Sequence, residues 1–212
     1  MQPITVSAGG FAAADTNAIA ESQTPAGAED LTLTATPYVL DPPRRVTITC
    51  AGNDTARTFT VTGTTFGGYP ITEQLAGSNN SITTSTLDFA TVTNIAVDDA
   101  TAGAVIAGYA QEGGSRWVRM DSWANAQSVV QVNTSGTVTY SVQTTMDDPN
   151  SPTGAVAVED VTWLDALDAN LVTETVAKSG FFAYTPTFVR LVASGGSGTA
   201  TMTIAQFSVV PR

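Results

Sequence analysis

The chain of 212 residues contains no histidine, one cysteine (Cys50) and one lysine (Lys178). Without histidine, Ser-His-Asp and Cys-His catalytic groups and histidine-ligated zinc are excluded. A single cysteine excludes an intramolecular disulfide and any zinc or iron–sulfur site that needs several thiolates. P-loop and dinucleotide-binding fingerprints are also absent, because the glycine pairs lack the required context. We therefore expect a protein that is not an enzyme and that binds no cofactor.

Charge is also scarce. Charged residues make up 13% of the chain, against roughly 25% in average proteins. Eight basic residues stand against 19 acidic ones, which gives a net charge of −11. A surface this acidic repels the phosphate backbones of nucleic acids and the anionic headgroups of lipids. We therefore expect neither nucleic acid nor a membrane as partner.

Long apolar segments are lacking as well. No apolar run approaches the roughly 20 residues of a membrane-spanning helix. The first residues, MQPITVSAGG, lack the basic and apolar regions of a signal peptide. These absences predict synthesis and folding in a cytoplasm.

Threonine and apolar residues are what the chain has in abundance. Hydrophobic residues account for 42%, and there are 35 threonines. From Leu31 onward the two kinds alternate in LTLTAT, RVTITC, TFTVTG and TSTLDFATV, with the turn sequences AGND, FGGYP and AGSNNS between them. A period of two predicts half-buried strands with threonine on the wet face. The prediction is an all-β fold, an antiparallel β-sandwich of jelly-roll-like type.

Composition divides the chain into three parts. Residues 1–30 are rich in Ala, Gly and Ser, and we predict an extended N-terminal arm in which Ile4, Val6 and Phe11 bind a partner. A frayed terminus is the alternative. The Gly-Gly segment AQEGGSR at 110–116 predicts a boundary between a β-sandwich or barrel domain at 31–112 and a second β-sandwich domain at 113–212.

The second half contains two apparent hairpins. In VVQVNTSGTVTYSVQTT, the residues Val130 and Val132 are predicted to face Val138, Tyr140 and Val142 across the turn NTSG. The segment FVRLVASGGSGTATMTIAQF predicts another hairpin, closed by SGGSG. Between them, the helical spacing of Trp163, Leu167 and Leu171 predicts a turn or two of helix.

Carboxylates are the remaining candidates for chemistry. Asp98-Asp99 and Asp147-Asp148 are adjacent pairs, whereas a glycosidase needs two carboxylates placed across a cleft. Adjacent acids in loops are more typical of turns, and that is our prediction for both pairs. A calcium site at Asp147, Asp148 and Asn150 is an alternative, although its spacing matches no EF-hand.

The aromatic residues and the cysteine allow two interpretations each. The aromatics either form a sugar-stacking platform or anchor a core or subunit contact, and the second use is the more common; they are Trp117, Trp123, Trp163, Tyr140 and Tyr184. Cys50 shares strand parity with Val46 and Ile48, so we predict a buried, unreactive thiol rather than a reactive one.

Two long segments resemble proteins of tailed bacteriophage particles. PRRVTITCAGNDTARTFTVTGTTFGGYPITEQLAG followed by TSTLDFATVTNIAV resembles a segment common in their virion proteins, where a "PRxVTIT" strand leads to "TFTVTGTD" and then to an "F.TVTSI" strand. In the second half, SVVQVNTSGTVTYSVQTTMDDPNSP, TWLDAL and FVRLVASGGSGTATMTIAQ are similar to the companion region. Together these segments cover most of residues 37–206 and leave residues 1–30 uncovered.

The resemblance implies a structural protein of the virion and supplies no catalytic residue. The role that the resemblance implies first is a head decoration (cement) protein on the capsid exterior, with the major capsid protein and further copies of itself as expected partners. A homotrimer is expected because capsid lattices offer threefold positions. The alternatives are a neck, tail or head-fibre component, or a carbohydrate-binding attachment module.

Overall fold

The computed structural model describes residues 3–121 and 126–208 and is all-β, with 55% strand and 3% helix. The strand pairings whose register is established are antiparallel. The predicted all-β class is therefore confirmed, and the antiparallel sheets are consistent with the predicted β-sandwich. The sheets of the described residues form no closed barrel. None of these residues belongs to a helix with the length and hydropathy needed to cross a membrane.

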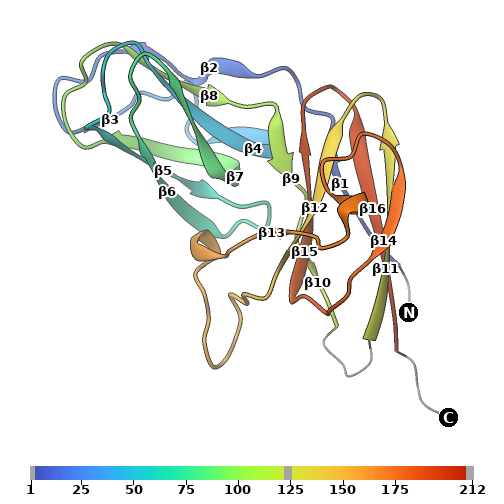
Figure 1. The fold of residues 1–212 in the computed structure, drawn as a ribbon. Helices are drawn as coiled ribbons and strands as arrows, with labels where there is room; N and C mark the ends of the chain where they lie inside the picture. The colour runs from blue at the N-terminus through green and yellow to red at the C-terminus, as the bar shows by residue number, and fades with distance from the viewer. Residues whose placement is uncertain (1–2, 122–125, 209–212) are drawn as a thin grey trace. The chain divides into compact units, whose positions relative to one another are not determined.

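The chain forms two compact units (Figure 1). Unit 1 combines residues 1–11 with residues 114–212, and unit 2 is formed by residues 12–113. The division at 113/114 falls within the segment AQEGGSR, in the short strand β9 (Glu112–Gly114). The division at 11/12 has no counterpart in the predicted domains and makes unit 1 discontinuous in sequence.

Unit 2 contains one sheet of seven strands. Six of them follow the order β2-β8-β4-β7-β5-β6, and β3 pairs with β7. The strands are β2 (Asp15–Gln23), β3 (Glu29–Asp30), β4 (Tyr38–Cys50), β5 (Thr58–Thr64), β6 (Pro70–Ala76), β7 (Ile82–Val97) and β8 (Val105–Tyr109).

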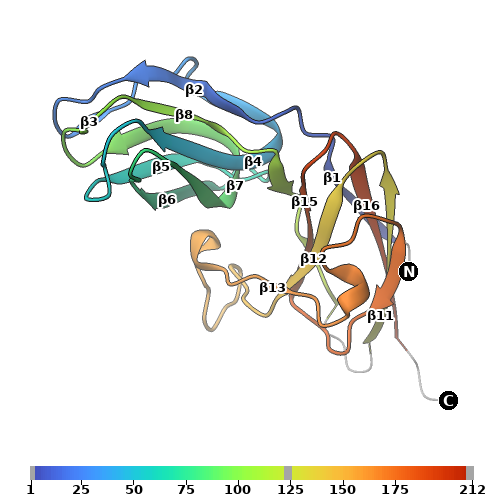
Figure 2. The same ribbon diagram turned by 45° about the horizontal axis from the view of Figure 1, so that its top comes forward.

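The core of unit 2 follows from the period-two pattern. In β5 the buried residues alternate with half-exposed threonines, and Phe59 and Val61 are fully buried. The long strands β4 and β7 are interrupted by register shifts, for example between Arg45 and Thr47. Such bulges bend a strand, so one sheet can turn its apolar side chains toward a common interior. Figure 2 shows the strands of this sheet from a second side.

Unit 1 contains two sheets, with strand orders β1-β16-β11-β14 and β10-β15-β12-β13. Their strands are β1 (Ile4–Gly9), β10 (Val118–Arg119), β11 (Ala126–Ser135), β12 (Thr139–Thr145), β13 (Leu164–Asp165), β14 (Lys178–Phe181), β15 (Phe188–Ser194) and β16 (Thr199–Ser208). Side chains from both sheets, including Val130, Val142, Leu191 and Met202, make one buried cluster. The apolar faces of the two sheets therefore pack against each other, as in a sandwich.

Both predicted hairpins are wrong in their pairing. β11 and β12 lie in different sheets, and so do β15 and β16; instead β11 pairs with β16 and β12 pairs with β15. The four valines that were predicted to face one another are nevertheless buried in the same cluster; they are Val130, Val132, Val138 and Val142. A hairpin would leave one apolar face uncovered, whereas crossing from one sheet to the other buries both faces.

Two local predictions are also wrong. The LTLTAT segment forms no strand, although Leu31 is buried. Where a turn or two of helix was expected, the structure has only the 3-10 turns η1 (Val158–Asp160) and η2 (Ala169–Leu171). The Asp168 carboxylate accepts a hydrogen bond from the Asn170 amide at 3.0 Å, which caps a single turn at the start of η2. Leu167 is 75% exposed, so no apolar helical face forms.

The predicted arm is replaced by three strands, β1, β2 and the short β3, which pairs with β7 in unit 2. β1 pairs along its whole length with β16, from Ile4 opposite Ile204 to Gly9 opposite Thr199. β2 pairs with β8 in unit 2. Residues 1–30 are thus shared between the two units instead of extending from the fold.

Candidate functional site

Aromatic rings and arginines gather on the β10-β15-β12-β13 sheet of unit 1. The Trp117 ring, just before β10, meets Trp163 edge-on with centroids 5.0 Å apart, and meets Phe188 at 5.8 Å. The Arg190 guanidinium lies 4.5 Å from the centroid of the Trp163 ring. The cluster thus joins β15 to the connection before β13 by cation–π and edge-to-face contacts.

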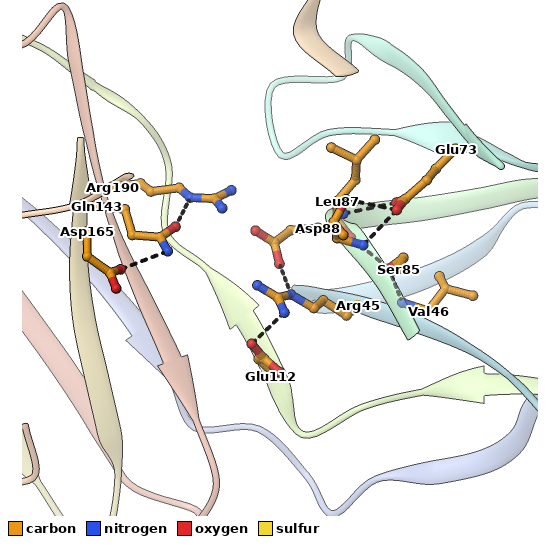
Figure 3. Close-up of polar contacts among 11 residues, drawn as sticks. Arg45, Val46, Glu73, Ser85, Leu87, Asp88, Glu112, Gln143, Asp165 and Arg190 are labelled. Carbon is orange, nitrogen blue, oxygen red and sulfur yellow. Dashed lines mark hydrogen bonds and ion pairs between the residues drawn. The ribbon is translucent and has the colours of Figure 1, made fainter. Parts of the chain in front are cut away.

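Arg190 is held in place by a polar chain (Figure 3). Its Nε donates to the Gln143 side-chain oxygen at 3.0 Å, and the Gln143 amide nitrogen donates to Asp165 at 3.2 Å. Arg190 is only 6% exposed, and a buried guanidinium is costly unless hydrogen-bonded and paired. We conclude that these contacts first serve to hold the arginine within the fold.

Asp148 forms a second arginine contact in unit 1. The Arg119 guanidinium donates to both of its carboxylate oxygens, at 3.2 and 2.8 Å, and the Asn150 backbone amide donates at 2.9 Å. These hydrogen bonds hold the pKa of Asp148 below its usual value, and the bond from Arg119 has the largest effect. The neighbouring Asp147 accepts from the Thr162 amide at 2.8 Å.

The candidate calcium residues are therefore already bonded to protein donors. No three His, Cys, Asp or Glu side chains within 3–121 and 126–208 come together in a way that could hold a metal ion. Asp147, Asp148 and Asn150 form a hydrogen-bonded loop, as expected of turn residues.

The residues of the possible sugar platform are not gathered on one open surface. Tyr140 is 1% exposed, its hydroxyl donates to the Val176 carbonyl at 3.0 Å, and burial raises its pKa to about 12. Trp163 has Arg190 against its ring, and the Tyr184 hydroxyl is 2.7 Å from that of Thr144. Trp123 lies outside the described residues.

In unit 2, Arg45 lies between two carboxylates (Figure 3). Its guanidinium is 2.7 Å from Glu112 and 3.9 Å from Asp88. Close by in the same view, the Glu73 carboxylate accepts from the Leu87 amide at 3.0 Å and from the amide and hydroxyl of Thr86 at 2.7 and 2.8 Å. This carboxylate connects β6 to the middle of β7.

The other predicted acid pair also meets an arginine. Arg57 is 3.0 Å from Asp99 and 3.9 Å from Asp98. A hydrogen bond from the Ala100 amide, with the nearby Arg57, lowers the pKa of Asp99. Both adjacent pairs thus support turns, and the lowered pKa values of Asp99 and Asp148 make these two carboxylates poor proton donors near neutral pH.

The residues assigned to the arm have a different role. Val6 and Phe11 are 8% and 2% exposed and belong to the core of unit 1. Only Ile4 remains accessible, at 43%. The interpretation of these residues as anchors for another molecule is corrected, because the groove that Val6 and Phe11 fill belongs to their own chain. Cys50 is buried, as predicted.

Sequence reasoning missed the polar residues that brace the strands. Glu73 and Arg190 each interrupt a strand of otherwise uncharged residues, ITEQLA and FVRLVAS. A charged residue inside such a strand is a signal for an internal partner, because a buried charge needs pairing. Asp54 is similar: it is 1% exposed and accepts from the Ala102 amide at 2.6 Å.

Comparison with protein-family models, with curated proteins and with solved structures finds no match to this chain.

Proposed function

We propose that the protein is a structural component of a tailed-bacteriophage virion, and more specifically a head decoration protein that binds the major capsid protein lattice from outside. In this proposal it works through surface contacts between folded units, without a bound cofactor. Copies arranged as trimers would match the threefold positions of a capsid lattice.

The single observation that carries the proposal is where the resembling segments lie. PRRVTITC belongs to β4, TFTVTG to β5 and TSTLDFATVTNIAV to β7, which are neighbours in the sheet of unit 2. The second set coincides with β11, β12, β15 and β16, the paired strands of unit 1. The likeness to virion proteins therefore involves the strands that build both units.

The use of charge supports the same proposal. Arg45, Arg57 and Arg119 contact carboxylates, while Arg44 and Arg190 lie against the aromatic rings of Tyr109 and Trp163. Charged side chains thus brace loops and strands, and many outward strand positions are threonine or serine. Such a surface suits broad contacts of matching shape.

The test is the copy number in particles purified from the producing phage, measured by quantitative mass spectrometry against the major capsid protein. We expect hundreds of copies per particle, as a symmetric lattice requires, whereas about a dozen would indicate a neck or tail component. Absence of the protein from purified particles would overturn the assignment to the virion.

A further inference from the structure

The outer face of the β1-β16-β11-β14 sheet has an unusual composition. Cross-strand partners arrange its side chains in rows: Phe181, Val129 and Ala205; then Ser179, Gln131, Thr203 and Thr5; then Asn133, Thr201 and Ser7. Ser135 and Thr199 continue the pattern. We call these twelve residues the outer face; their inward neighbours, such as Val6, Val130 and Met202, are buried.

No residue of the outer face is charged. This is notable in a chain with 19 acidic and eight basic residues. The acidic residues of unit 1 lie instead in connections and in the short β13, as Asp148 and Asp165 do. The surfaces of soluble domains normally carry interspersed charges of both signs, which oppose association. The outer face lacks that protection.

One end of the outer face is apolar and open. Phe181 is 62% exposed and Val129 is 46% exposed, and the two are direct cross-strand partners. The rest of the face is covered by hydroxyls and amides, with Thr5 and Thr203 hydroxyls 3.2 Å apart and Ser7 and Thr201 hydroxyls 3.0 Å apart. A hydroxyl is both donor and acceptor, so a row of hydroxyls is complementary to an identical row.

We propose that the outer face is the contact surface for a second copy of this chain, packed face to face about a two-fold axis. Two chains that each carry −11 repel each other, and an uncharged surface is where they can approach at least cost. Self-complementary hydroxyls and the Phe181–Val129 patch favour an identical partner, since an isologous contact presents the same surface twice. A basic partner would be attracted to the acidic surfaces instead.

The size of the outer face predicts a weak dimer. Strands lie about 4.8 Å apart and alternate residues about 6.7 Å apart, so the twelve positions cover roughly 400 Å² per copy. Two copies would bury about 800 Å² in total, without the area that protruding side chains add. This is below the roughly 1,200 Å² of stable specific interfaces and within the range of weak, transient contacts. We therefore expect association in the micromolar-to-millimolar range. The inference does not depend on the proposed function.

The experiment measures sedimentation equilibrium of the full chain from micromolar to millimolar concentration. Thr203→Glu and Thr203→Lys each place a charge near the centre of the face, and each should raise the dimer Kd by about a hundredfold, because like charges would face each other. Mixing the two variants should restore association as a heterodimer. Thr72→Glu and Thr72→Lys, at an exposed threonine of β6 in unit 2, are the matched controls and should leave the Kd unchanged.

Phe181→Ser tests the apolar end without adding charge and should weaken the dimer by about tenfold. Added salt should strengthen the wild-type dimer, because it screens the repulsion of the acidic chains while the face has no ion pair to lose. Unchanged circular dichroism shows that each variant is folded.

A wild-type chain that stays monomeric throughout overturns the proposal. So does a dimer that survives both Thr203 variants, or a failure of the mixed variants to associate. A trimer that the Thr203 variants dissociate also overturns it, because the outer face would then join copies about a threefold axis, whereas a trimer that they leave intact uses another surface. If the wild-type chain is always monomeric and the Thr203 variants lose their binding to phage particles, the outer face contacts another protein, and the proposal is overturned as well.

Discussion

The two units solve the same packing problem in different ways. Unit 2 bends one seven-stranded sheet at bulges, whereas unit 1 stacks two sheets whose described pairings run without register shifts. Unit 2 has 11 acidic and three basic residues, and unit 1 has eight and five. Alternation of apolar and threonine residues therefore specifies strands in both units. The bulges determine whether one sheet bends or two sheets stack, and the placement of charge determines how acidic each unit's surface is.

The chain carries natural reporters for comparing the units. All three tryptophans belong to unit 1, and the single cysteine belongs to unit 2. Tryptophan fluorescence therefore follows the unfolding of unit 1. The accessibility of the buried Cys50 thiol to labelling follows the opening of unit 2.

Deleting residues 1–11 should have the largest effect and should be confined to unit 1. The deletion removes Val6 and Phe11 from the core and leaves β16 without one of its two partners. Loss of these two side chains alone costs about 3–6 kcal/mol, against a typical total stability of about 5–15 kcal/mol. We expect the tryptophan fluorescence transition in urea to be lost or shifted to low denaturant, while labelling of Cys50 stays slow.

Ile4→Ala is the matched control for this deletion. Ile4 lies on the same strand but is 43% exposed, so the free energy of unfolding should change by only about 0.5 kcal/mol. A truncated chain with the fluorescence transition of the full chain would show that β1 contributes little to unit 1.

Phe89→Ala should have the next largest effect, in unit 2. Phe89 is fully buried, and removing such a ring costs about 3–5 kcal/mol. Cys50 labelling should accelerate and the circular dichroism transition should broaden, with the fluorescence midpoint unchanged. Phe66→Ala, at a ring that is 53% exposed, is the control. If fluorescence and labelling shift together, the two units unfold as one and the division is only geometric.

Asp148→Asn should have the smallest effect, visible mainly in its pH dependence. The folded-state pKa of Asp148 is lowered by the Arg119 hydrogen bonds. The ionised carboxylate therefore stabilises unit 1 above its ordinary pKa of 3.8, and this contribution is lost as the pH falls through the lower folded-state value. The difference in fluorescence midpoint between wild type and variant should be present at neutral pH and disappear in acid.

A double-mutant cycle with Arg119→Gln isolates the pair. In that background, Asp148→Asn should have a smaller effect at neutral pH than in the wild type. Equal effects in both backgrounds would mean that the loop amides, and not Arg119, stabilise the carboxylate.

The local sequence pattern was sufficient to predict where most strands lie, but insufficient to predict which strands pair with each other. TFTVTG in β5 and TYSVQTT in β12 form strands because polar and apolar residues alternate along them. The pairing of β11 with β16 in place of β12 depends on burying two apolar faces at once, which no local window contains. The ITVSAG stretch of β1 looks like part of an arm in its local sequence. Its partner, β16, begins only at Thr199, so no local window contains both strands.

The candidate site shows the same limit. Asp147 and Asp148 were recognisable as loop residues, yet the Arg119 contact joins residues 29 positions apart. Trp163, Leu167 and Leu171 have helical spacing, but only Leu171 is fully buried. Helical spacing without a neighbouring surface to cover it does not form a helix, because tertiary packing supplies most helical stability.

The return of the chain to unit 1 after residue 113 has a consequence for its biosynthesis. A ribosome translates β1 before unit 2 and the strand that pairs with it, β16, after unit 2; the hydroxyl contact between Thr5 and Thr203 closes a separation of 198 residues. Unit 2 is complete in the nascent chain when little of unit 1 exists, and domains generally fold as they emerge. Unit 2 should therefore fold on the ribosome before unit 1, while β1 stays unpaired until β16 has been translated.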